Sequence, residues 1–242
     1  MSAAGSCVSR PPLAFHHISV DCVVAAFDGQ RLRVLLLRRI GDGLADYKLP
    51  GSLIYQDEDL DEAAGRILST LCGIRRVPMR QFKAYGSKDR TRAPRDVDWL
   101  ENTQHVRVER IITIAYLGSL RLTAALQRRV ASHGGEWIDV DSLPPLAFDH
   151  RQIITDAVET LRRNAEAEPE IIFGMLPAKF TESMLRCLFE ALCSRAFDVR
   201  NFHKKMKAMP YIQPLDEFET GVSHRAARYY RFDRAAYHHQ RK

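Results

Sequence analysis

The sequence of 242 residues has no uncharged apolar run near the ~20 residues that a membrane-spanning helix requires, so no transmembrane span is predicted. Met1 to Pro12 lack a basic stretch followed by an apolar core, so no secretory signal peptide is expected. The 5 cysteines form no C-x-x-C pair, which excludes a zinc ribbon and indicates a reducing, cytoplasmic setting. We therefore expect a globular protein without a metal or other cofactor.

Charge is distributed unevenly along the chain. The formal net charge is +6, from 36 basic and 30 acidic side chains. Residues 1–170 hold 23 of each, whereas residues 171–242 hold 13 basic and 7 acidic side chains and carry the whole excess. A neutral body followed by a basic end is typical of proteins that bind a polyanion through that end.

Strand patterns dominate the first half of the neutral body. Apolar runs rich in β-branched residues at 17–27 and 32–37 flank an Asp28-Gly29-Gln30 turn and predict a β-hairpin. Further short strands are predicted at 48–53, 79–84, 110–117 and 137–140. These strands indicate one mixed sheet.

Helical spacing follows the first strands. A helix with apolar positions three and four apart is predicted from Leu60 to Leu71, with Gly73 as its stop, and a second over 152–164. The mixture of strands and helices predicts an α+β fold. The acidic, proline-containing stretch 165–170 is expected to be a linker. The predicted organisation is a loose segment 1–14, a body 15–168 and a separate domain 169–242.

The basic end has the order of elements found in a winged helix-turn-helix. Thr181 is expected to cap a helix through Leu192, and Asp198 to cap a second helix whose buried side holds Val199, Phe202, Met206 and Met209. Strands are then predicted at 211–215 and 227–232, on either side of a polar loop. Helix, tight turn, helix and β-hairpin together predict a DNA-binding domain.

The second of these helices presents cations and an amide opposite its apolar side. We expect it to be a recognition helix, since cations bind phosphates and Arg or Asn read base edges in the major groove. His224 and Arg225 fall in the loop between the strands, where a wing would contact DNA. The predicted DNA-binding residues are Arg200, Asn201, His203, Lys204, Lys207, His224 and Arg225. DNA is favoured over RNA, because no aromatic stacking platform is evident.

The neutral body resembles the Nudix box, G-x5-E-x7-R-E-U-x-E-E-x-G-U, over Ser52 to Ile74. Ser52 stands at the box glycine, Glu58 at the first glutamate, Arg66 at the arginine and Gly73 at the closing glycine. The resemblance implies a Nudix-like mixed sheet sandwiched by helices.

Three glutamates that hold divalent metals in this family are missing. Their positions are occupied by Ile67, Thr70 and Leu71, which cannot supply the oxygen charge that Mg²⁺ requires. No catalytic residue and no metal site is therefore predicted. We expect Arg66 to bind loop carbonyls and Glu58 either to favour the helix N-terminus or to retain a functional role.

A Nudix-like domain without its carboxylates, followed by a winged helix, resembles the Nudix-related transcriptional regulators. The resemblance includes 146–150 (LAFDH) and 198–205 (DVRNFHKK), where His203 replaces a common Arg. It implies a dimeric repressor that binds a sugar or nucleotide-sugar effector, such as ADP-ribose or a pentose like arabinose, without hydrolysing it. The expected partners are double-stranded operator DNA, the effector and a second copy of the chain.

Four polar side chains are predicted to contact the effector. Arg39 ends a strand, Lys48 precedes the box, and the pair Asp89 and Arg90 matches an Asp-Arg pair of the family. The segment 91–107 is longer than usual for the family and is expected to reshape the pocket. Trp99 within it either stacks on a sugar or packs on the surface.

Two other functions remain open. An active Nudix hydrolase would need to use Glu58 with Asp57 or Asp61 on ADP-ribose or a nucleoside diphosphate derivative. A protein scaffold would use the basic C-terminal face to bind an acidic partner. Mg²⁺-dependent turnover would support the hydrolase, and indifference to DNA would support the scaffold.

Overall fold

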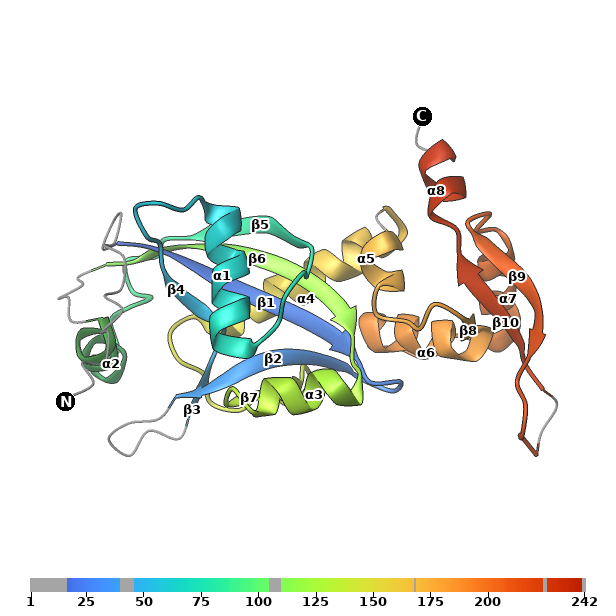
Figure 1. The fold of residues 1–242 in the computed structure, drawn as a ribbon, viewed down its shortest axis with the longest axis horizontal. Coiled ribbons are helices and arrows are strands. Elements are labelled where there is room, and N and C mark those ends of the chain that lie inside the picture. The colour runs from blue at the N-terminus through green and yellow to red at the C-terminus, as the bar shows by residue number, and fades with distance from the viewer. Residues whose placement is uncertain (1–16, 40–45, 105–109, 168, 224–225, 241–242) are drawn as a thin grey trace, which may run out of the picture.

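The computed structural model describes residues 17–39, 46–104, 110–167, 169–223 and 226–240. It places a seven-stranded mixed sheet at one end of the molecule and a three-stranded winged helix at the other (Figure 1). The α+β prediction is confirmed. The segment predicted to be loose, 1–14, lies outside the described residues, and no described helix is long and apolar enough to span a membrane.

The large sheet has the strand order β3-β2-β1-β6-β5, with β4 paired to β1 and β7 paired to β2. Strands β1 and β6 run parallel over their whole length, and the other pairs are antiparallel. The strands are β1 (Ile18–Phe27), β2 (Leu32–Arg39), β3 (Asp46–Lys48), β4 (Gly51–Leu53), β5 (Met79–Tyr85), β6 (Ile112–Arg121) and β7 (Gly135–Asp139). The predicted strands of the body are present with ends shifted by a few residues, except that the segment 48–53 is divided into β3, which pairs with β2, and β4, which pairs with β1.

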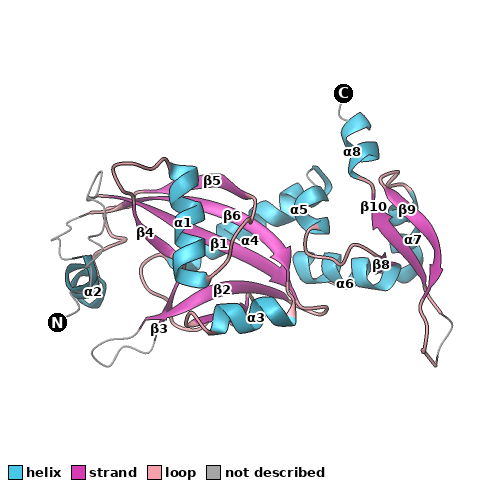
Figure 2. Cartoon of the chain, viewed as in Figure 1, coloured by secondary structure: helices cyan, strands magenta, loops and turns pink. Residues whose placement is uncertain are grey.

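Helices cover both faces of this sheet because β1 is apolar on both sides. Val20, Cys22 and Val24 face α1 (Leu60–Cys72) and α3 (Ala124–Ala131), whereas the alternate residues Val23 and Ala25 face α4 (His150–Ala167). Figure 2 shows α1 and α4 on opposite sides of the sheet. Gly73 ends α1 in a left-handed conformation, with φ of 64°, as the sequence predicts.

Two helices of the body were not predicted. The long segment after β5 contains α2 (Pro94–Gln104), and α3 follows an N-cap at Thr123. In its described residues, the stretch expected to be a linker is also helical, because α4 continues to Ala167 and α5 (Pro169–Phe173) begins two residues later. Ala165 is 5% exposed, so the end of α4 is packed rather than free.

The C-terminal part is a winged helix. Thr181 and Asp198 cap α6 (Glu182–Cys193) and α7 (Val199–Lys207) as predicted, each accepting a hydrogen bond from a backbone N–H three residues on. The small sheet has the order β8-β10-β9. Its strands are β8 (Phe180–Thr181), β9 (Ile212–Phe218) and β10 (Arg228–Phe232), and α8 (Arg234–Gln240) ends the described chain.

One hydrophobic core joins the large sheet to the winged helix. Val23 of β1 and Leu161 of α4 belong to the same buried cluster as Phe173 of α5, Leu188 of α6 and Phe202 of α7. Ser119 of β6 also donates a hydrogen bond to the carbonyl of Ile171. The two parts therefore pack on each other through side chains as well as through the chain connection.

Candidate functional site

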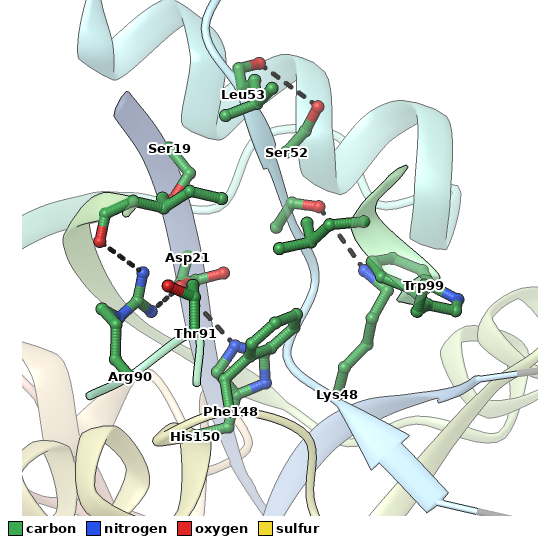
Figure 3. A pocket seen from close by; sticks show the side chains of 13 residues that line it. Ser19, Asp21, Lys48, Ser52, Leu53, Arg90, Thr91, Trp99, Phe148 and His150 are labelled. Carbon is green, nitrogen blue, oxygen red and sulfur yellow. Dashed lines mark hydrogen bonds and ion pairs between the residues drawn. The ribbon is translucent and has the colours of Figure 1, made fainter. Parts of the chain in front are cut away.

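A pocket lies at the end of the large sheet remote from the winged helix (Figure 3). It lies between β1, the β3–β4 segment, the loop after β5, α2 and the start of α4, and is partly open to solvent. Its lining residues are Ser19, Asp21, Lys48, Gly51, Ser52, Leu53, Arg90, Thr91, Trp99, Leu100, Ile111, Phe148 and His150. Hydroxyls, both signs of charge and aromatic rings thus meet in one concave site, which is typical of small-molecule binding.

Asp21 is the buried acid of this pocket. Its carboxylate lies 3.4 Å from Arg90 Nη2 and 3.6 Å from His150 Nε2. Burial alone raises the pKa of a carboxyl group, but His150 and Arg90 hold the pKa of Asp21 well below its usual range. The side chain is therefore an ionised acceptor, suited to the hydroxyl groups of a ligand.

His150 is held in one orientation at the start of α4. Its Nδ1 accepts a hydrogen bond of 3.0 Å from the backbone N–H of Leu49. The ring proton is therefore on Nε2, which faces Asp21. His150 belongs to the LAFDH segment that carries the family resemblance, but neither His150 nor Asp21 is among the predicted site residues. The available signal was that Asp21 is the single charged residue in the ten-residue strand β1.

Arg90 is buried, and other protein groups already accept much of the hydrogen bonding that its guanidinium can donate. It donates to both carboxylate oxygens of Asp149 at 3.0–3.2 Å and to the carbonyl of Ile111 at 3.3 Å. Its remaining contact is with Asp21. Arg90 therefore shapes the pocket and fixes Asp21 as much as it offers charge to a ligand.

Lys48 is the cation with the weakest contacts in the pocket. It is half-buried, and its Nζ lies 3.4 Å and 3.5 Å from the carbonyl oxygens of Leu49 and Gly51. Burial lowers the pKa of Lys48. Its Nζ is also 5.4 Å from the ring centroid of Trp99, which α2 projects over the pocket. A negatively charged or hydroxyl-rich ligand would improve the environment of this ammonium group.

The structure separates the other two predicted effector residues from the pocket. Arg39 is fully buried and bound to Asp46 and Asp96, and Asp89 is exposed and paired with Arg92 at 2.6 Å. Of the four predicted effector residues, Lys48 and Arg90 therefore line the pocket, whereas Arg39 and Asp89 do not. The position of Arg39 at the end of a strand did not indicate that its side chain points inward, toward Asp46 on β3 and Asp96 on α2.

Arg66 ties the helix that resembles the Nudix box to the loop before it. Arg66 donates to both oxygens of Glu58 at 2.6 Å and to the carbonyl of Leu53 at 3.1 Å, which agrees with the loop-binding role expected for it. Ile67 is fully buried in the core, and Thr70 donates to the carbonyl of Arg66. In the described part of the chain, no three His, Cys, Asp or Glu side chains are grouped so as to hold a metal ion.

The basic side of α7 is exposed as the helical spacing predicts. Arg200, Lys204 and Lys207 point to solvent, and Phe202 and Met206 are buried. His203 instead lies 2.7 Å from Glu182, so its ring is held by the first turn of α6. Lys205 lies over the rings of Phe189 and Phe197, as expected for a cation that covers the apolar side. His224 and Arg225 lie outside the described residues.

Comparisons with known proteins agree with both parts of the fold. Residues 172–232 match the family model of the NrtR DNA-binding winged helix domain. The chain is similar to Shewanella oneidensis NrtR in complex with a 27mer DNA, with 25% identity and a TM-score of 0.68, over 89% of this chain and 93% of that one. No curated protein sequence matches the chain.

Two further structures show the same fold. Shewanella oneidensis NrtR without DNA has 24% identity and a TM-score of 0.68, over 90% of this chain and 95% of that one. A MutT/nudix family protein from Enterococcus faecalis has 21% identity and a TM-score of 0.62, over 93% and 89% of the two chains. The Nudix-like body and the winged helix therefore occur together in relatives of known structure.

Proposed function

Since the chain is of the Nudix-related transcriptional regulator type, a Nudix fold joined to an NrtR-type winged helix, we propose that it is a ligand-responsive repressor that binds operator DNA as a dimer. Residues 15–168 act as the sensor and residues 169–242 as the DNA reader. The observation that carries this proposal is the exposed basic side of α7 in a domain that matches a DNA-binding family model. Such a function agrees with the cytoplasmic setting expected from the cysteines.

The effector is proposed to be a sugar or nucleotide-sugar metabolite. Asp21 accepts hydrogen bonds from its hydroxyl groups, Lys48 neutralises its negative charge, and Trp99 stacks on its apolar face. Trp99 and Leu100 come from α2, so the long segment after β5 supplies one wall of the pocket. We therefore expect the ligand preference of this chain to depend on this wall, which the shorter segment usual for the family would not provide.

Binding without hydrolysis is the proposed chemistry of the sensor. Two of the three carboxylates of the alternative hydrolase are already engaged, because Glu58 is paired with Arg66 and Asp61 accepts a hydrogen bond from the Tyr116 hydroxyl at 2.5 Å. A metal that bound there would have to displace these partners. Mg²⁺-dependent turnover of ADP-ribose that is lost in Glu58→Gln would favour the hydrolase instead.

The proposal is tested by selecting DNA fragments that bind the full chain and measuring their affinity over a range of salt concentrations. We expect sequence-specific binding that weakens with salt, and release when ADP-ribose, a pentose or a nucleotide sugar is added. Failure to select any sequence at any salt concentration would contradict the DNA-binding function. Retained specific binding with no response to the ligand panel would contradict only the choice of effector.

Replacing Lys48 by Met is expected to weaken effector binding about 10- to 100-fold, because the cation of the pocket is lost. Burial disfavours the charged form of Lys48, so the folded protein without effector should keep its melting temperature. The measurement is the effector-induced rise in melting temperature. Lys88→Met, at an exposed position in the loop after β5, is the matched control and should leave that rise unchanged.

Helix α4 connects the sensor pocket to the reader. His150 at its start lines the pocket, and Arg162, about 18 Å further along at 1.5 Å per residue, reaches the turn between α6 and α7. Arg162 donates to the carbonyl of Leu192, and its Nη2 lies 2.7 Å from Ser194 Oγ. We propose that a ligand which shifts His150 changes the position of α7 through this single helix.

Replacing Arg162 by Ala is expected to remove most of the effector response while DNA affinity without effector changes by less than about threefold. Two hydrogen bonds of about 1 kcal/mol each are comparable to the 1–3 kcal/mol of a typical coupling free energy. The measurement is the DNA dissociation constant with and without effector. Arg163→Ala is the control, because Arg163 bonds to Thr160 of the same helix. An undiminished response in Arg162→Ala would exclude this route.

A further inference from the structure

The first residue of α7 is an exposed aliphatic side chain on a helix that otherwise buries its apolar residues. Val199 is 59% exposed, whereas Phe202 and Met206 are 1% and 2% exposed. Helical spacing in the sequence assigns Val199 to the buried side with these two residues, and the structure shows that assignment to be wrong. Asp198 fixes the helix start by accepting the Asn201 N–H at 2.9 Å, so Val199 stands in the first turn.

Val199 borders a hollow between the first turns of α6 and α7 that is otherwise polar and largely cationic. Arg200 and Lys204 line it from α7, and Arg186 lines it from α6. His203, also on the wall, is held by Glu182 at 2.7 Å. Arg186 is paired with Glu190 at 2.7 Å, so Arg200 and Lys204 are the cations beside the Val199 isopropyl group that are open to a partner. This arrangement matches a surface that is apolar at one point and anionic around it.

The major groove of DNA is such a surface. N-terminal residues of a recognition helix contact base edges there, and phosphates lie on both sides. Thymine is the one base that presents a methyl group in this groove, and small apolar side chains contact it. The position of Val199 in the first turn of α7 and its small apolar side chain therefore both indicate a contact with thymine.

We infer that Val199 is a specificity-determining residue that packs on the 5-methyl group of a thymine in each operator half-site. The inference rests on the proposed DNA-binding function and adds a base preference to it. Arg200 and Lys204 flank Val199 in the hollow, where Arg200 reaches a neighbouring base edge and Lys204 holds a phosphate beside that thymine. The contact discriminates thymine from cytosine and also from uracil, which lacks the methyl group.

The test uses DNA selected from a random pool by the full chain, followed by replacement of each thymine with deoxyuridine. For the unchanged protein, we expect about a fourfold loss of affinity at one position of each half-site, the value of one buried methyl group. For Val199→Ala, affinity should already be lower by a similar factor, and deoxyuridine at that position should cost nothing further. Val222→Ala is the control, because Val222 is also exposed, at 38%, but lies in the loop after β9. Because the loop after β9 is the expected wing, Ile112→Ala is added as a second control, at a residue that is 43% exposed in β6 of the large sheet. Both controls should keep the full sensitivity to the methyl group.

Each other outcome overturns a different statement. If no DNA sequence is selected, the proposed function itself fails. If a sequence is selected but no thymine shows a methyl effect that depends on Val199, the base contact is wrong while DNA binding stands. If Val199→Ala leaves DNA preference unchanged and alters the mass of the protein in solution, Val199 is a protein contact and the inference fails.

Discussion

Replacing Arg39 by Met is expected to lower the free energy of unfolding by about 3–5 kcal/mol, the cost of breaking a buried ion pair by removing one partner. The Arg39 side chain has no exposed surface, and those of Asp46 and Asp96 are each 3% exposed. Arg39 donates to both oxygens of Asp46 at 2.6–2.8 Å and to Asp96 at 2.7 Å. Without it, two carboxylates would remain buried with the guanidinium of Arg95 at 3.7–3.8 Å as their nearest ion-pair partner.

The same substitution should also open the pocket. Asp96 stands in the first turn of α2 and links that helix to β2 through Arg39, and it accepts the Phe148 N–H at 3.1 Å. Losing this tie frees the helix that carries Trp99, so effector binding should weaken together with stability. Arg39 is therefore a positioning residue for the pocket wall, although it does not line the pocket.

Urea unfolding followed by circular dichroism measures the first effect. Arg33→Met is the matched control, because Arg33 pairs with Asp28 at a partly exposed site and its loss should cost less than about 1 kcal/mol. Equal stability of the two variants would contradict the assignment of Arg39. Replacing Arg39, Asp46 and Asp96 together by apolar residues should recover much of the loss, which separates the charge effect from packing.

Replacing Lys204 by Glu is expected to weaken operator binding about 10- to 100-fold at ~0.15 M salt. Lys204 is exposed on the basic side of α7 and makes no ion pair with any residue in the described ranges. The substitution removes one phosphate contact and adds repulsion, so the dependence of log affinity on log salt should become shallower by about one unit. Loss should be similar for every sequence that binds, because phosphate contacts carry no base preference.

The salt series has two controls. Lys88→Glu makes the same charge change in the loop after β5, remote from α7, and should alter affinity by less than about threefold. Arg200→Ala should cost about 1–3 kcal/mol on the preferred sequence and less on others, since an arginine at a base edge contributes to specificity. Equal effects of Lys88→Glu and Lys204→Glu would mean that net charge, and not the face of α7, governs binding.

Local signals in the sequence were sufficient for most of the fold. The continuous apolar run of β1, the Gly73 stop and the caps at Thr181 and Asp198 each depend on neighbours in sequence, and each is present in the structure. Helix α2 was not predicted because its own apolar pattern is weak. Much of its stabilisation comes from tertiary contacts of Asp96 and Leu100. The linker prediction was wrong for a similar reason. The composition around Ala165 is typical of a linker, but Ala165 is buried.

The candidate site was predictable in part. Lys48 and Arg90 line the pocket as expected, since both lie next to segments that the resemblance identifies. Arg39 could not be separated from them by sequence, because its partner Asp96 is 57 residues away. The prediction that Val199 is buried was wrong. Helical spacing assumes that one side of a helix is buried along its whole length, whereas the first turn of α7 is exposed on that side.

The hydrophobic core shared by the large sheet and the winged helix has a thermodynamic consequence. Because Leu161, Phe173 and Leu188 belong to one buried cluster, neither part can unfold without exposing apolar surface of the other. Heating should therefore melt the chain in a single cooperative transition, with calorimetric and van't Hoff enthalpies that agree. A ligand held only by the sensor would then raise the temperature at which the reader unfolds by the same amount. The proposed boundary near residue 168 would then divide tasks along the chain without dividing the protein into separate units of stability.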